Sequence, residues 1–301
     1  MDLLLATFAT LTYKSIAVTA MEIIDAHVHV WNFDQAEYAW LKNDTSVLNR
    51  NYDIEELQPQ KESAGITAGI LVQAANNFED TNWMLHVADT TGWIKGVVGW
   101  LPLMNPAFTA TALREYLSNH YFKGVRHLIH DEPDPRWLLQ PEVIQSLSVL
   151  AAYDVPYDVV GVKPEHLRTA LQVAEKVPDL RLMLDHLNQP PIVSGERFGE
   201  WGDLMKEAAK YNNIYAKISG LGTASQKGAA WTASDIEPYV AFVLEHFGEN
   251  RCVCGGDWPV STLAGNYTQT WQQYQKVLSG LLNKTALEKV LSINAVKFYH
   301  L

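Results

Sequence analysis

The chain has 301 residues, of which 48% are hydrophobic and 19% charged, and its formal net charge is -11. This composition is typical of a globular protein with enough apolar material for a large core. The acidic balance and the lack of a basic run of five or more residues argue against nucleic acid and anionic membranes as partners. No uninterrupted run of about 18 apolar residues occurs, so we expect no membrane-spanning helix.

The first twenty residues differ from the rest of the chain. They are apolar and rich in threonine, they lack the basic start of a signal peptide, and Lys14 interrupts the apolar part. Because Val18-Thr19-Ala20 resembles a cleavage site, export stays open. We interpret residues 1–20 as an N-terminal extension and residues 21–301 as a single catalytic domain.

The only two cysteines, Cys252 and Cys254, stand two positions apart on one expected strand. That spacing is poor for a mutual disulfide. Buried reduced thiols suit a reducing compartment, so we expect a cytoplasmic protein. The oligomeric state stays open, with a homo-oligomer among the expectations.

Short apolar segments alternate with helical patterns along the chain. The expected strands cover residues 23–29, 68–73, 94–103, 123–130, 155–160, 180–187, 214–219 and 252–255. The expected helices cover residues 52–64, 79–92, 109–121, 141–153, 165–177, 199–211, 235–247, 268–282 and 285–298. Strands separated by helices favour parallel pairing, and eight such units predict an α/β fold, a (β/α)8 TIM barrel. The competing open sheet usually has a glycine-rich motif after its first strand, where this chain has His-Val-His.

Two histidines and a distant aspartate form the most informative pattern. His27 and His29 are spaced i, i+2, so on a strand both side chains point to one face. Asp257 follows the last expected strand. Because barrel closure makes the first and last strands neighbours, we expect the three side chains to converge. A His-x-His pair alone is also compatible with a structural role.

Polar residues recur where the expected strands end, which is where TIM-barrel enzymes place their active sites. They are His27, His29, Gln73, Trp100, Arg126, His130, Asp158, His186, Lys217, Ser219 and Asp257. Burying such groups unpaired costs about 1–3 kcal/mol each, so their concentration indicates an enzyme. Strand alternation predicts that Asp185, opposite in parity to His186, points away from the mouth. By the same argument His127 lies behind the barrel wall. Arg126 is also compatible with a role in a surface ion pair. Asp158 is also compatible with a role in orienting another group.

Six motifs carry a resemblance to a known family, over about residues 21–301. They are Ile24-Asp25-Ala26-His27-Val28-His29-Val30-Trp31, Tyr38-Ala39-Trp40-Leu41, Lys123-Gly124-Val125-Arg126-His127, Leu184-Asp185-His186-Leu187, Tyr215-Ala216-Lys217-Ile218-Ser219-Gly220-Leu221 and Gly256-Asp257-Trp258-Pro259-Val260. In this order and spacing, the chain resembles the amidohydrolase superfamily, and within it the amidohydrolase 2 branch that holds L-fuconolactonases and L-rhamnono-lactonases. This chain departs from that branch at Ala39 (usually proline), at Gly256 (usually serine) and after His186, where the branch often has Gly-Lys-Pro.

The resemblance implies a hydrolase that opens a sugar-acid lactone of the L-fucono or L-rhamnono type. The implied catalytic residues are Asp257, His27, His29 and His186. The expected substrate-binding residues are Arg126, Gln73, Lys217, Asp158, Trp31 and His130, with Trp31 and Trp40 suited either to packing or to a pocket wall. The alternative is a metal-dependent, non-oxidative decarboxylase of an aromatic or unsaturated carboxylic acid on the same barrel.

The sequence leaves open whether the protein needs a metal ion. Two-metal members of the superfamily need a bridging lysine on strand four and a histidine on strand five, where this chain has Arg126 and Asp158. We therefore expect no two-metal centre. The remaining expectations are one Zn²⁺ or Mn²⁺ held by His27, His29 and Asp257, with or without His186, or no metal.

Overall fold

A computed structural model describes residues 21–301 of the chain. The N-terminal extension, residues 1–20, lies outside the described residues. Within the described part, no helix is both long and apolar enough to cross a membrane.

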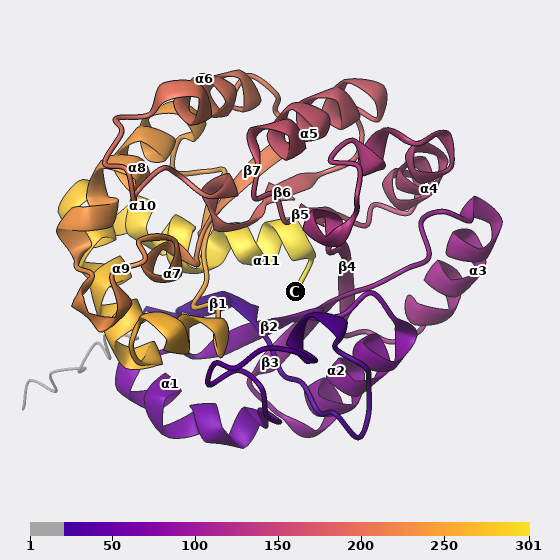
Figure 1. The fold of residues 1–301 in the computed structure, drawn as a ribbon, viewed down its shortest axis with the longest axis horizontal. Helices are drawn as coiled ribbons and strands as arrows, with labels where there is room; N and C mark the ends of the chain where they lie inside the picture. Colours follow the sequence, from indigo (N-terminus) through magenta and orange to yellow (C-terminus); the bar gives the residue numbers. More distant parts are fainter. Residues whose placement is uncertain (1–20) are drawn as a thin grey trace, which may run out of the picture.

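Eight parallel strands form one sheet in the sequential order β1 to β8, which confirms the predicted barrel (Figure 1). They are β1 (Ile24–Val28), β2 (Ala68–Val72), β3 (Ile94–Gly99), β4 (Phe122–His127), β5 (Tyr157–Val159), β6 (Leu182–Leu184), β7 (Ile214–Ile218) and β8 (Cys252–Cys254). Most of these strands are shorter than the apolar segments from which we predicted them, because the chain leaves the sheet to form the opening at the carboxyl end of the barrel.

The two ends of the sheet meet just beyond β8. The amide of Asp257 donates to the His27 carbonyl at 2.8 Å, and the amide of His29 donates to the Trp258 carbonyl at 2.7 Å. Gly255 permits this approach, since a Cβ atom there would lie 2.6 Å from the Cβ of His27. The barrel therefore closes at the level of the candidate active residues.

The helices are arranged mostly as an outer ring around the barrel, and α11 lies across one of its ends (Figure 1). They are α1 (Gln58–Ala64), α2 (Phe78–Thr90), α3 (Pro106–Tyr116), α4 (Pro141–Ala152), α5 (Pro164–Lys176), α6 (Gly199–Ala208), α7 (Leu221–Ala224), α8 (Ala233–Phe247), α9 (Tyr267–Leu281), α10 (Lys284–Glu288) and α11 (Asn294–Tyr299). Proline occupies the first turn of α3, α4 and α5, where its missing N–H costs no hydrogen bond. The predicted helix over residues 285–298 is divided into α10, a π-helical turn and α11.

Two apolar cores hold this architecture. The larger one lies between the strands and the surrounding helices. The smaller one fills the barrel interior with inward residues such as Ile70, Val98 and Val253, and it includes Phe298 and Tyr299 of α11. Helix α11 thus closes the amino-terminal end of the barrel, and only the carboxyl end is left for a site.

Candidate active site

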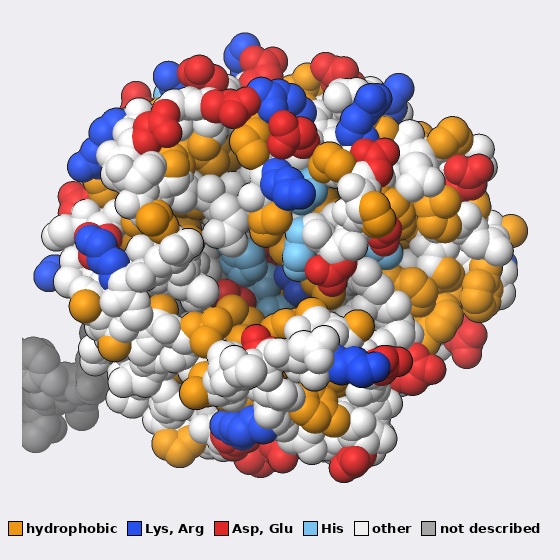
Figure 2. Space-filling view, viewed as in Figure 1, with side chains coloured by type: hydrophobic (Ala, Val, Ile, Leu, Met, Phe, Trp, Pro, Cys, Tyr) orange, Lys and Arg blue, Asp and Glu red, His pale blue; other side chains and the backbone are white. Residues whose placement is uncertain are grey.

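A pocket of about 260 Å³ opens at the carboxyl end of the barrel. Figure 2 shows it as a hollow in this face with histidine side chains on its floor. Its lining is His29, Trp31, Trp40, Ala74, Arg126, Leu128, His130, Val160, Val162, His186, Gln189, Gly220, Thr223, Ala224, Asp257 and Val260. A larger surface depression beside residues 33–49 contains none of the strand-end residues. The barrel pocket is therefore the candidate site.

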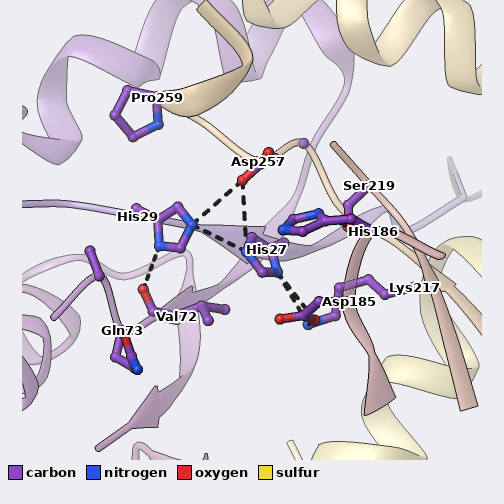
Figure 3. A network of polar contacts seen from close by, with 12 residues as sticks. His27, His29, Val72, Gln73, Asp185, His186, Lys217, Ser219, Asp257 and Pro259 are labelled. Atoms are coloured by element: carbon purple, nitrogen blue, oxygen red, sulfur yellow. Dashed lines mark hydrogen bonds and ion pairs between the residues drawn. The ribbon is translucent and has the colours of Figure 1, made fainter. Parts of the chain in front are cut away.

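His27, His29 and Asp257 converge at the base of this pocket, as the strand pattern predicts (Figure 3). The Nε2 atoms of the two histidines are 3.1 Å apart. The Asp257 Oδ1 atom lies 3.7 Å from Nε2 of His27 and 3.5 Å from Nε2 of His29. Burial lowers the pKa of His29, and lowers that of His27 well below its usual value, so both rings are neutral near pH 7.

An irregularity in β1 aims His27 into the barrel. Asp25, two residues earlier, faces outward and accepts hydrogen bonds from Tyr267 and Trp271 of α9. Strict alternation would turn His27 outward as well. The register between β1 and β2 shifts between Asp25 and Val28, and this shift changes the face on which His27 lies. The Asp25 carboxylate also accepts the amides of His27 and Gly256, which fixes the β1–β8 seam from outside.

His186 follows β6 in an unusual backbone conformation. Residues 186–189 all have positive φ, between 49° and 55°, although none is glycine. Each such residue costs about 1–2 kcal/mol relative to a right-handed conformation. Glycine, which the resemblance leads us to expect at position 187, would adopt this conformation without strain, whereas this chain has Leu187 there. It turns the His186 ring toward His27, with 4.6 Å between ring centroids, and Nδ1 of His186 lies 2.9 Å from the Ser219 hydroxyl.

The prediction that Asp185 points away from the mouth is wrong. The strand ends at Leu184, and the left-handed residues that follow break the alternation on which that prediction depended. Asp185 instead lies inside the barrel, 3.6 Å from His27 Nδ1, 2.8 Å from Lys217 and 3.1 Å from Arg126. Burial alone would raise its pKa, but the Lys217 ammonium and the Arg126 guanidinium help to hold that pKa well below its usual range.

Four buried or nearly buried charges lie at the base of the pocket or beneath it. Arg126 and Lys217 pair with Asp158 and Asp185, and Arg126 also donates to the Gln73 carbonyl. Two cations and two anions balance, which satisfies the rule that buried charges are paired. Desolvation raises the pKa of Asp158 to about 6, with Lys217 opposing the shift.

The predicted substrate-binding residues divide into two levels. Arg126, Trp31 and His130 line the pocket. Lys217 and Asp158 are fully buried below it, and Gln73 donates to the Arg126 carbonyl. These positions favour a role for Lys217, Asp158 and Gln73 in supporting the pocket residues over direct contact with a substrate. His127 lies behind the wall, as alternation predicts, stacked on Trp137 at 4.0 Å.

Several pocket residues carry no signal in the sequence. Val162, Gln189 and Thr223 come from loops and from the short helix α7, without periodicity or motif. The buried Thr223 hydroxyl and the buried Nδ1 of His130 have no hydrogen-bond partner among the described residues. Both residues line the pocket, so a ligand there would lie beside them.

The donor set is compatible with one divalent cation. Zinc bonds of about 2.0–2.1 Å in a tetrahedral site place neighbouring ligand atoms roughly 3.3 Å apart. The atoms of His27, His29 and Asp257 are 3.1–3.7 Å apart, and His186 has a ligand atom within 4.8 Å of those of His27 and Asp257. Arg126 and Asp158 face each other on β4 and β5, where a second metal would need a lysine and a histidine.

Comparison with known proteins now defines the class. The sequence profile of the Amidohydrolase family matches residues 24–301, and the chain belongs to this family. It is 32% identical to an L-fucono-1,5-lactonase of Burkholderia ambifaria, over 92% of this chain and 95% of that protein. It is 28% identical to an L-rhamnono-gamma-lactonase of Scheffersomyces stipitis, over 60% of each chain.

A solved structure supports the same relationship. An amidohydrolase from Burkholderia multivorans, determined with bound zinc, superposes with a TM-score of 0.84 and 28% identity, over 93% of this chain and 99% of that one.

Proposed function

We propose that the protein hydrolyses a sugar-acid lactone, of the L-fucono or L-rhamnono type, by attack of water on the lactone carbonyl. The observation that carries the proposal is the placement of Asp257 beside three histidines and Arg126 at the base of one pocket. Two of the curated relatives are lactonases of these two kinds, which favours lactone opening over the alternative decarboxylation.

Asp257 is the proposed general base. It takes a proton from water as the water oxygen bonds to the carbonyl carbon, and the carbonyl oxygen gains a negative charge. The ring C–O bond then breaks, and Asp257 returns the proton to the departing alkoxide. The product is the open hydroxy acid. Asp257 suits both steps because it reaches the pocket and is only 4% exposed.

His186 and Arg126 are the proposed stabilisers of the charged carbonyl oxygen. Side chains fixed by packing stabilise such charge without reorganising during the reaction. His186 is held by Ser219 at 2.9 Å and Arg126 by Asp185 at 3.1 Å. Trp31, Trp40 and Leu128 form apolar walls against which a sugar ring can lie.

His27, His29 and Asp257 would hold a single Zn²⁺ or Mn²⁺. When bound, such an ion supplies a Lewis acid for the carbonyl and acidifies water. Arg126 would orient the lactone, and the aromatic walls would exclude water, whether or not the ion is bound.

We further propose that the protein acts in the cytoplasm on a free small molecule, without nucleic acid or membrane partners. The two buried, unpaired cysteines support a reducing compartment. A homo-oligomer is compatible with this proposal.

The test is a pH-indicator assay of acid release from L-fucono-1,5-lactone and L-rhamnono-lactones, with and without EDTA. Asp257→Asn should lower kcat by about 10²–10⁴-fold, because it removes the base but keeps the shape. Its melting temperature serves as the folding control. Turnover by a folded Asp257→Asn variant at the wild-type rate would refute the assignment. Carbon dioxide release from an aromatic acid would favour the decarboxylase.

A further inference from the structure

Lys217 is the charged group closest to His27 on the side away from the pocket. Its side chain is fully buried. Its Nζ atom lies 2.6 Å from Asp158 Oδ2, 2.8 Å from Asp185 Oδ1 and 3.3 Å from His27 Nδ1. A lysine ammonium has three N–H donors and no acceptor. The three neighbours therefore match its three donors, and His27 Nδ1 must accept.

This requirement determines where the neutral His27 ring carries its proton. If Nδ1 accepts from Lys217, the ring proton is on Nε2, which faces Nε2 of His29. His29 has the opposite arrangement, because its Nδ1 lies 2.6 Å from the Val72 carbonyl, which only accepts. Its Nε2 is then an acceptor, 3.1 Å from Nε2 of His27. Hydrogen bonds run in one direction from Lys217 through both rings to Val72 (Figure 3).

The other tautomer has weaker contacts. A proton on Nδ1 of His27 would face Asp185 across 3.6 Å, beyond hydrogen-bond range. It would also face an N–H of Lys217, and the lone pairs of both Nε2 atoms would meet at 3.1 Å. One contact favours the tautomer with the proton on Nδ1. Arg126 Nη1 lies 3.4 Å from Nε2 of His27 and can donate to it, but this distance is longer than the 3.1 Å between the Nε2 atoms of His27 and His29.

The position of Lys217 is itself fixed from the closed end of the barrel. The Tyr299 hydroxyl, on α11, donates to Asp158 Oδ2 at 2.7 Å. That oxygen is the one that accepts from Lys217. Tyr299, Asp158 and Lys217 are all buried, so water does not compete for these bonds.

We propose that Lys217, held by Asp158 and Tyr299, is a positioning residue that keeps the proton of His27 on Nε2, where it is directed at Nε2 of His29. His27 then holds the ring of His29, which lines the pocket; the contact of His29 with a lactone rests on the proposed function, whereas the tautomer does not. A cation that used Nε2 of His27 as a ligand would first have to displace this proton.

The direct test is long-range ¹H–¹⁵N NMR of the full-length protein labelled with ¹⁵N-histidine, before and after EDTA treatment. His27→Gln identifies the His27 signals by their loss. We expect the ¹⁵N shifts of a protonated Nε2 and an unprotonated Nδ1. A proton on Nδ1 of His27, or a metal-bound Nε2, would overturn the proposal whatever the substrate is.

A pair of tyrosine variants tests the far end of the network. Tyr299→Phe removes only the hydroxyl that holds Asp158, and we expect a shift of His27 toward mixed tautomers. We also expect kcat to fall about 3–10-fold at unchanged KM, the size of one ordinary hydrogen bond. Tyr157→Phe is the matched control, because the buried Tyr157 hydroxyl has no hydrogen-bond partner among the described residues. Identical His27 spectra in Tyr299→Phe and wild type would remove Tyr299 from the proposal. Absence of lactonase activity alongside the expected wild-type spectrum would refute only the proposed function.

Discussion

Asp185 shows how one side chain links charge balance to site geometry. It accepts from Lys217 and Arg126 and lies beside His27, with no exposed surface. Its carboxylate offsets part of the cost of burying both cations. Neither function is readable from its place in the sequence, because the left-handed backbone after it decides which way it points.

Replacing Asp185 should therefore destabilise the fold. We expect Asp185→Asn to lower the free energy of unfolding by about 3–5 kcal/mol, since removing one partner leaves buried charge uncompensated. Urea unfolding followed by tryptophan fluorescence measures this. Asp131→Asn, on a carboxyl that is 48% exposed, is the control and should change stability by less than about 0.5 kcal/mol. Equal effects of the two variants would contradict the buried network.

At the scale of elements, the site depends on segments that are not regular. Residues 186–189 form a left-handed turn, and Trp201 of α6 donates its indole N–H to the Leu187 carbonyl at 2.7 Å. A second irregular segment, the long loop that carries Trp40, is held by Asp80 of α2. The Asp80 carboxylate accepts from Tyr38 and from the amides of Ala74 and Ala75.

Trp201→Phe should loosen the turn that aims His186. We expect kcat to fall about tenfold, because a small displacement of an active group has a large effect on rate. Stability should fall by only about 1–3 kcal/mol, the cost of an unsatisfied buried carbonyl. Trp83→Phe is a matched control, since the buried indole N–H of Trp83 has no partner among the described residues. If both variants keep wild-type kcat, the turn does not depend on Trp201.

Asp80 predicts a pH dependence of stability. Burial raises its pKa from 3.8 to about 6. Because this pKa is raised, Asp80 is still protonated in the folded state at pH values at which it has already ionised in the unfolded state. The contribution of Asp80 to stability therefore falls as the pH rises through about 6. Between pH 5 and pH 7, wild type should lose about 1.4 kcal/mol relative to Asp80→Asn. Urea unfolding of both proteins at the two pH values measures this difference, and an unchanged or opposite difference would refute it.

At the scale of the whole molecule, the sequence predicts the barrel well and its irregular parts poorly. The eight apolar segments became eight parallel strands, and the ends of β1 and β8 meet as closure requires. Periodicity succeeded because it follows from regular backbone geometry. It failed at Asp185, where four left-handed residues follow. It could not find Thr223, which lies on a short helix without a motif, or Tyr299, whose partner Asp158 is 141 positions away in the sequence.

Helix α11, which closes the amino-terminal end of the barrel, gives a prediction for the stability of the whole molecule. Phe298 of α11 is 1% exposed and packs on Tyr215, with 4.8 Å between ring centroids. Phe298→Ala should lower the free energy of unfolding by about 3–5 kcal/mol through the cavity that it leaves. Leu281→Ala, on the exposed end of α9, should cost much less. A small loss in Phe298→Ala would mean that α11 contributes little to the core.

The seam between β1 and β8 also has a consequence for synthesis. The Gly256 amide donates to Asp25, a residue 231 positions earlier in the chain. A ribosome releases the His27–His29 pair early, but Asp257 emerges much later. The nascent polypeptide therefore carries an incomplete and inactive site until Asp257 has been synthesised. Because such distant contacts form slowly, we expect activity to appear only after this seam has closed.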